Sequence, residues 1–161
     1  MRLIHIGHLR GGILGRMSVE GSDLNRPYGS PLLWCIPENS RETWIESRYC
    51  RIEEHNVLAD TPNRIWTLEL LPTARLLVVD CKKDLHKLIR PYPHNIGPEP
   101  VDWVSVGHEH DAFWLTARGL RLTRIEFPYW DCETVVVLNS AVVRIIDSIP
   151  LPDEALARFL L

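Results

Sequence analysis

The stretch WDCETVVVLNSAVVRII, residues 130–146, carries the clearest strand signal in the chain. It contains two runs rich in β-branched residues, Glu133–Leu138 and Ala141–Ile146, with Asn139 and Ser140 between them. β-branched side chains pack well on the pleated surface of a sheet, so both runs are expected to be strands. The short polar break between them indicates a hairpin or two bent strands.

The other strand and helix signals do not alternate regularly along the chain. Apolar or alternating runs predict strands at residues 1–7, 31–36, 64–70 and 76–80. A helix is expected from the capping box of Asn39 and Glu42 to about His55, with further helical segments at 82–90, within 102–119 and after 150. Gly and Pro predict loops at 11–30 and 91–100. This order favours a single α+β domain with mostly antiparallel strands over a doubly wound parallel sheet.

Composition indicates a folded protein of one domain's size. The chain has 161 residues, of which 45% are hydrophobic and 24% charged, enough to bury a core without disulfides. The net charge of -3 disfavours a broad electrostatic grip on nucleic acid, although Arg118, Arg121 and Arg124 could form a local basic stripe with Arg64 or Lys82. The four cysteines show no CxxC spacing, which favours free thiols over a zinc or redox site.

Sequence signals for membranes and export are weak. No apolar run is long enough to span a bilayer, so no membrane association is expected. The N-terminus has no apolar core followed by a cleavage site. The expected localisation is cytoplasmic, or delivery into a target cell without a removable signal peptide.

Two acids stand where the apolar strand of residues 134–138 begins. Asp131 and Glu133 are two residues apart, so in an extended segment their side chains share one face. A rigid sheet can hold such a pair, with one carboxylate as an anion and the other as a hydrogen-bond partner. A solvated turn is the structural alternative for this pair.

Three further patterns have both a chemical and a structural interpretation. His5 and Gly7 in LIHIGH could contact a ribose or a phosphate-bearing ligand, or His5 could be a half-buried structural residue. Trp34 in PLLWCIP could stack on a flat ring or lie in the core. His108 and His110 could hold a metal together with a third ligand, or belong to a solvated loop. The metal interpretation is the less favoured, and no metal is expected.

In their order along the chain, these segments resemble the ADP-ribosyltransferase superfamily, especially its small bacterial and phage toxin-like or effector-like members. LIHIG is similar to the family's first strand, which carries a His or Arg, and LLWCI is similar to its GLWxS segment. WDCETVVVLN resembles its E-x-E motif, with Glu133 in place of the catalytic glutamate. Ile36 stands where the second motif ends in serine, and Asp131 is shorter by one methylene than the first glutamate. The resemblance implies split, mostly antiparallel sheets with two or three helices in one domain, residues 1–161.

The resemblance also implies an activity, NAD-dependent mono-ADP-ribosylation of a macromolecule, with NAD as the substrate and a protein as the expected target. Glu133 would then stabilise the cationic ribose, and Asp131 would position or deprotonate the acceptor. The residues expected around NAD are His5, Ile6, Gly7, Trp34 and Cys35. Three alternatives stay open: an NAD glycohydrolase or nucleic-acid modifier on the same fold, a non-catalytic binding or inhibitor protein, and a metal-dependent hydrolase using His108 and His110.

Overall fold

The computed structural model describes residues 1–7, 9, 19–23, 26–29, 33–40, 64–86, 88, 101–128 and 130–150. The strands are β1 (Arg2–Gly7), β2 (Val19–Asp23), β3 (Arg26–Gly29), β4 (Leu33–Pro37), β5 (Arg64–Leu70), β6 (Leu76–Val79), β7 (Ala112–Leu115), β8 (Thr134–Val137) and β9 (Val143–Pro150). The helices are α2 (Lys82–Leu85), α3 (Trp103–Glu109), α4 (Ala117–Leu122) and the 3-10 helix η1 (Ser140–Val142). Within the described ranges, no helix has the length and apolar character that a membrane crossing requires.

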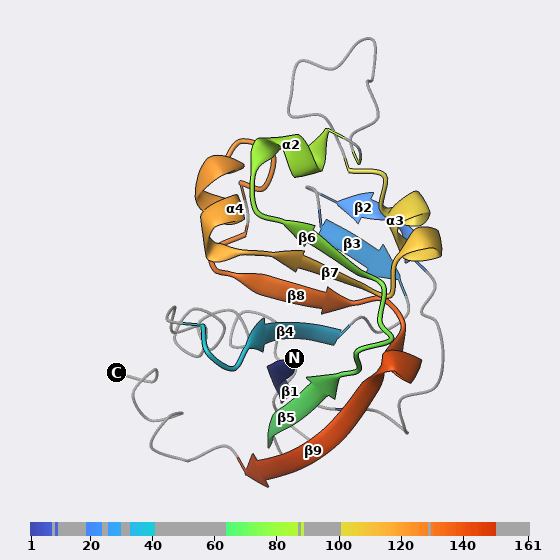
Figure 1. Ribbon diagram of the computed structural model, residues 1–161, viewed down its shortest axis with the longest axis vertical. Coiled ribbons are helices and arrows are strands. Elements are labelled where there is room, and N and C mark those ends of the chain that lie inside the picture. The colour runs from blue at the N-terminus through green and yellow to red at the C-terminus, as the bar shows by residue number, and fades with distance from the viewer. Residues whose placement is uncertain are drawn as a thin grey trace.

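Seven strands form one sheet in the order β6-β7-β8-β4-β1-β5-β9, and β2 and β3 pair separately (Figure 1). Strands β6 and β7 run parallel, whereas the other pairings of the large sheet are antiparallel. The chain is therefore an α+β single domain with a mixed, mostly antiparallel sheet and few short helices. This confirms the fold class expected from the irregular order of strand and helix signals.

The sheet divides at β4, whose two ends pair with different partners. Leu33, Trp34 and Cys35 pair with β8, whereas Ile36 and Pro37 pair with β1. We call β6, β7, β8 and β4 the upper half and β1, β5 and β9 the lower half, as they lie in Figure 1. The end of β5 lies near η1, which follows β8, because the Leu71 N–H donates to the Val142 carbonyl.

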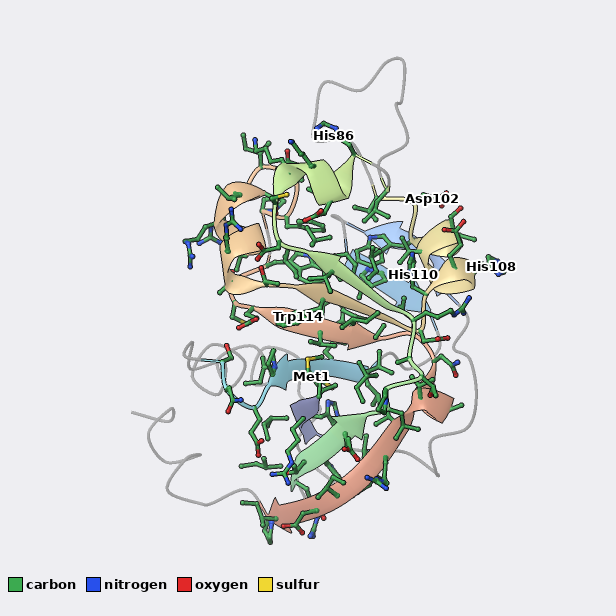
Figure 2. The ribbon with its side chains drawn as sticks, viewed as in Figure 1. Met1, His86, Asp102, His108, His110 and Trp114 are labelled. Carbon is green, nitrogen blue, oxygen red and sulfur yellow. The ribbon has the colours of Figure 1, made fainter. Side chains whose placement is uncertain are left out.

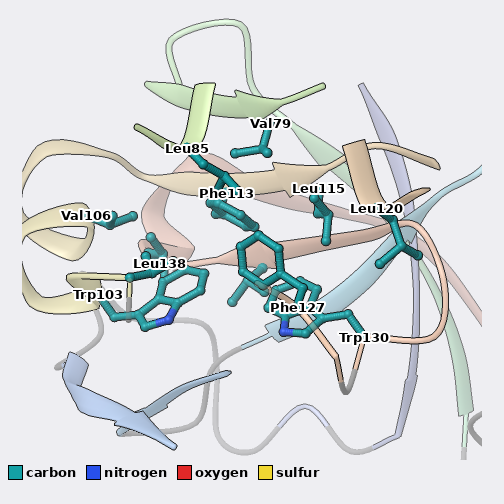
Figure 3. Close-up of a cluster of buried hydrophobic side chains, with 12 residues drawn as sticks. Val79, Leu85, Trp103, Val106, Phe113, Leu115, Leu120, Phe127, Trp130 and Leu138 are labelled. Carbon is teal, nitrogen blue, oxygen red and sulfur yellow. The ribbon is translucent and has the colours of Figure 1, made fainter. Parts of the chain in front are cut away.

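A first hydrophobic cluster covers one face of the upper half, and α2, α3 and α4 each contribute buried side chains to it. Aromatic rings form its centre, with centroids 4.8 Å apart for Trp103 and Phe113 and 5.1 Å apart for Phe127 and Trp130 (Figure 3). Trp34 packs against this cluster through Trp130, at a centroid distance of 5.2 Å. Edge-on and tilted contacts of this kind suit the quadrupoles of the rings.

A second hydrophobic cluster lies on the opposite face and joins the two halves of the sheet. Leu3 and Leu68 belong to the lower half, and Val135 and Val137 to the upper half. Val136, between the last two, belongs to the first cluster, as the alternation of side chains along a strand requires. Strand β8 is thus buried on both faces, which explains its unbroken apolar run.

The run at residues 133–146 is not a hairpin, which corrects one of the two expectations for it. Strand β8 pairs with β4 and β7, whereas β9 pairs with β5 at the far edge of the sheet. The four residues of β8 are all buried, whereas most of β9 is exposed. A strand buried on both faces takes a central place in a sheet, so the chain crosses from the centre to the edge through η1.

One other expectation was wrong, and two were partly right. The expected loop at 11–30 contains β2 and β3, whose polar sequences carry little strand signal. The segment at 102–119 is helical in part, as expected, because it contains α3 and the start of α4, but it also contains β7, a strand too short to separate from a helix by periodicity. The helix expected at 82–90 is α2, which ends at Leu85. The first helix expected after Asn39, the loop at 91–100 and the end of the chain fall outside the described residues.

Asp111 connects the starts of β6 and β7 to the end of β8. Its carboxylate accepts hydrogen bonds from Arg75 Nε (3.0 Å) and Nη2 (3.1 Å), from the Arg75 backbone N–H (3.0 Å) and from Asn139 Nδ2 (3.0 Å). Its backbone carbonyl accepts from the N–H groups of Leu138 and Asn139. The Arg75 guanidinium holds the pKa of this buried carboxyl well below its usual range.

Because the pKa of Asp111 is lower in the folded chain than in the unfolded chain, its contribution to stability is present above about pH 4 and is lost as the pH falls further. We expect Asp111→Asn to lower the free energy of unfolding by about 2 kcal/mol at neutral pH. Below that pH range the difference should shrink. Urea unfolding at several pH values measures both effects, and an equal difference at every pH would contradict the assignment.

Candidate functional site

Four polar or aromatic side chains lie on the face of the sheet that carries the second cluster. His5 in β1 pairs with Trp66 in β5, and residues paired across antiparallel strands share a face. Trp66 and Trp114 both pack against the second cluster. Glu133 accepts a hydrogen bond from the Trp114 indole. Together with Arg64, which lies two residues before Trp66 on the same face, these residues form what we call the candidate site.

The Glu133 carboxylate is held at the start of β8 by the indole of Trp114. The distance from Trp114 Nε1 to Glu133 Oε1 is 2.9 Å. Asp131 and Glu133 are more exposed than Cys132 and Thr134, which alternate with them and are buried. Asp131 is the more exposed of the two acids, and the chain bends at Cys132 between them.

His5 lies where the pairing between β1 and β4 stops. The register pairs Leu3 with Pro37 and Ile4 with Ile36, and no pair beyond these is present between the two strands. Instead, the His5 side chain bonds the main chain of β4, with 2.9 Å between its Nδ1 and the Trp34 carbonyl oxygen. A carbonyl only accepts, so Nδ1 carries a proton and, in the neutral ring, Nε2 is the acceptor. The imidazole is 7% exposed, and this bond fixes its orientation.

The remaining residues expected around NAD are distributed over both faces. The Trp34 ring lies on the first cluster, so only its carbonyl points to His5 and the ring is on the opposite face from Glu133. The Cys35 side chain faces the second cluster and is completely buried. The backbones of Ile6 and Gly7 continue β1 beyond His5 and pair with Ile65 and Arg64.

Trp114, Trp66 and Arg64 were not among the residues that the sequence predicted for the site. No strand was predicted at Trp114, and as a strand residue it would have been placed on one face with Val135, its partner in β8. Ile36, where the similar motif has serine, faces the same side as Trp34. The hydrogen bond that Glu133 accepts comes from the Trp114 indole.

The metal and basic-stripe patterns do not come together with the candidate site. Figure 2 shows His108 pointing outward from α3, with His110 at the end of the same helix. Among the residues that the structure describes, no group of three or more His, Cys, Asp or Glu could hold a metal ion. In the expected basic stripe, Arg118 Nη1 donates a hydrogen bond to Asp80 Oδ2 (2.7 Å), and Arg124 Nη1 donates to the Trp130 carbonyl oxygen (3.0 Å).

Comparisons of the chain with protein-family models, with curated proteins and with solved structures found no match. The side chains of the candidate site are therefore the basis for assigning a function. A carboxylate fixed by an indole N–H suits a developing positive charge, and a histidine of fixed tautomer suits a hydroxyl group. Half-exposed indoles suit flat rings, and a guanidinium suits a phosphate.

Proposed function

We propose that this protein is an NAD-dependent mono-ADP-ribosyltransferase, which cleaves the bond between nicotinamide and ribose and transfers ADP-ribose to a protein side chain. The observation that carries the proposal is the Glu133 carboxylate, fixed by Trp114 on the same sheet face as His5. The resemblance of LIHIG, LLWCI and WDCETVVVLN to the transferase motifs supports it, because β1, β4 and β8, which contain these motifs, are neighbours in the sheet.

Glu133 acts in this proposal by stabilising positive charge. When the bond from C1′ to the nicotinamide nitrogen breaks, its electron pair leaves with nicotinamide and the ribose becomes oxocarbenium-like. A carboxylate already oriented by the 2.9 Å bond from Trp114 needs no reorganisation to stabilise this cation. An acceptor nucleophile then forms the new bond at C1′.

Asp131 and His5 have separate tasks in the same reaction. Asp131 is exposed and lies two residues before Glu133, so its carboxylate can take the proton of an acceptor that arrives from solvent. His5 donates from Nδ1 to the Trp34 carbonyl, which fixes its ring on the sheet face where the proposal places a ribose. The His5 ring thereby orients the sugar without taking part in bond breaking.

The experiment that tests the proposal is incubation of the purified protein with NAD labelled in the adenylate portion, in the presence of a bacterial cell lysate. Nicotinamide release together with label on a discrete protein band supports a transferase. Release without a labelled acceptor identifies a glycohydrolase instead. Without any release, the enzymatic proposal is overturned and a binding protein on the same fold takes its place.

Trp114→Phe tests the bracing of Glu133 directly. The change keeps an aromatic ring beside the second cluster and removes the N–H that donates to Glu133. Because a hydrogen bond to a charged group contributes about 1.5–3 kcal/mol, we expect kcat for nicotinamide release to fall by about tenfold or more, with little change in KM.

The matched control is Trp103→Phe, which makes the same replacement on the opposite face. The Trp103 indole N–H is buried and has no hydrogen-bond partner among the residues that the structure describes. Its loss should leave kcat unchanged once folding has been checked by thermal unfolding. An equal loss of activity in both variants would point to general loosening of the sheet rather than to the bond with Glu133.

A further inference from the structure

Among the residues that the structure describes, Arg64 differs from the other arginines of the lower half in having no acidic partner. In that half, Arg144 forms an ion pair with Glu69, and Arg2 Nη1 lies 3.7 Å from Glu38 Oε1. Arg64 is half-buried, and its only hydrogen bonds within the described part of the chain go to Ser148, from Nε to Oγ (3.1 Å) and from Nη2 to the carbonyl oxygen (3.0 Å). A guanidinium that is partly out of water and has no carboxylate nearby attracts an anion strongly.

The neighbours of Arg64 hold its guanidinium in place. Its Cζ lies 5.8 Å from the centroid of the Trp66 ring, within the range of a cation–π contact. The two bonds to Ser148 use Nε and Nη2, so Nη1 keeps its donors for a ligand. A side chain that is already oriented loses less conformational entropy when it binds.

The position of Arg64 relative to His5 is set by the register of β1 and β5. His5 pairs with Trp66, and Gly7 pairs with Arg64. Positions two residues apart along a strand are about 6.5 Å apart and share a face. The pair of Gly7 and Arg64 therefore lies about that far from the pair of His5 and Trp66. This is roughly the distance between a ribose and the phosphates attached to it.

We propose that Arg64, held by Ser148 and Trp66, binds the diphosphate group of the dinucleotide. The proposal rests on the proposed function for the identity of the whole substrate, but the anion site has its own basis in the unpaired guanidinium. It assigns the ribose to His5 and the diphosphate to Arg64, which lies two residues before Trp66, the strand partner of His5, on the same face. Arg64 is therefore a binding residue and takes no part in bond breaking.

The test uses inorganic pyrophosphate and NAD as separate probes. Pyrophosphate binding is followed by tryptophan fluorescence, since Trp66 lies against Arg64, and is checked by calorimetry. We expect Arg64→Gln to weaken pyrophosphate binding by about tenfold to hundredfold, as loss of a charge-assisted contact does. In NAD turnover the same variant should raise KM by a similar factor and leave kcat within about twofold. Arg64→Lys keeps the charge without the planar fork, so its pyrophosphate affinity should lie between that of Arg64→Gln and that of the unchanged protein.

The control is Arg144→Gln, which removes an exposed arginine from the adjacent strand β9. It should bind pyrophosphate as the unchanged protein does, and thermal unfolding of all variants verifies folding. Equal pyrophosphate binding by Arg64→Gln and the unchanged protein, or no binding by either, overturns the inference. If pyrophosphate binding depends on Arg64 but NAD is not cleaved, the anion site stands and the proposed transferase activity fails. If NAD is cleaved with an unchanged KM in Arg64→Gln, the transferase activity stands and this inference fails.

Discussion

Glu133→Gln is expected to lower the rate of nicotinamide release from NAD by about 10²–10³-fold, the usual cost of losing one preorganised group that stabilises charge in a transition state. Glutamine has the same length and can still accept from the Trp114 indole. It lacks the negative charge that the cationic ribose requires. The measurement is single-turnover nicotinamide release, which separates the chemical step from product dissociation.

The control for Glu133→Gln is Glu109→Gln, the same replacement at an exposed position near the end of α3. Its rate should equal that of the unchanged protein. NAD affinity should also be similar in all three proteins, because Glu133 acts on the transition state. A Glu133→Gln protein that is folded, binds NAD and releases nicotinamide at the normal rate would remove Glu133 from the mechanism and with it the main support for a transferase.

Phe113→Ala is expected to cause the largest loss of stability, about 3–5 kcal/mol, because it removes a large ring from a well-packed core. Phe113 is completely buried in β7. Its ring contacts Trp103, Phe127 and Trp130 at centroid distances of 4.8, 6.0 and 5.7 Å. These neighbours come from separate segments, so the cavity cannot close by a local shift.

Urea unfolding followed by tryptophan fluorescence measures the loss in Phe113→Ala. Ile125→Ala is the matched control, since Ile125 is 69% exposed and its truncation should change the free energy of unfolding by less than about 0.5 kcal/mol. A loss below about 1 kcal/mol in Phe113→Ala would mean that the aromatic cluster around Phe113 is not the main core of the domain.

Much of the strand content could be predicted from the sequence. Strand β5 was predicted with its exact bounds, and β1, β4, β6 and β8 within a few residues, because their apolar residues follow strand periodicity. Strands β2, β3 and β7 were missed, since the first two are short and polar and the third is too short to show a period.

The candidate site was foreseen only in part. The residues expected to act on NAD included His5 and Glu133, which the structure places on one face, and Trp34, whose ring lies on the other. Trp114 and Arg64 were missed because neither belongs to a recognisable motif. Their positions depend on partners far away in the chain, Glu133 for one and Ser148 for the other.

The sequence by itself determined the class of the fold. It also determined which side chains of a predicted strand share a face, because alternation is a local property of an extended chain. Only the tertiary structure decided the strand order, the division of the sheet at β4 and the crossing from β8 to β9. These depend on which buried surfaces fit together across the whole domain, and local periodicity does not encode that choice. The bracing of Glu133 by Trp114 and the unpaired charge of Arg64 follow from that assembly, so they became visible only with it.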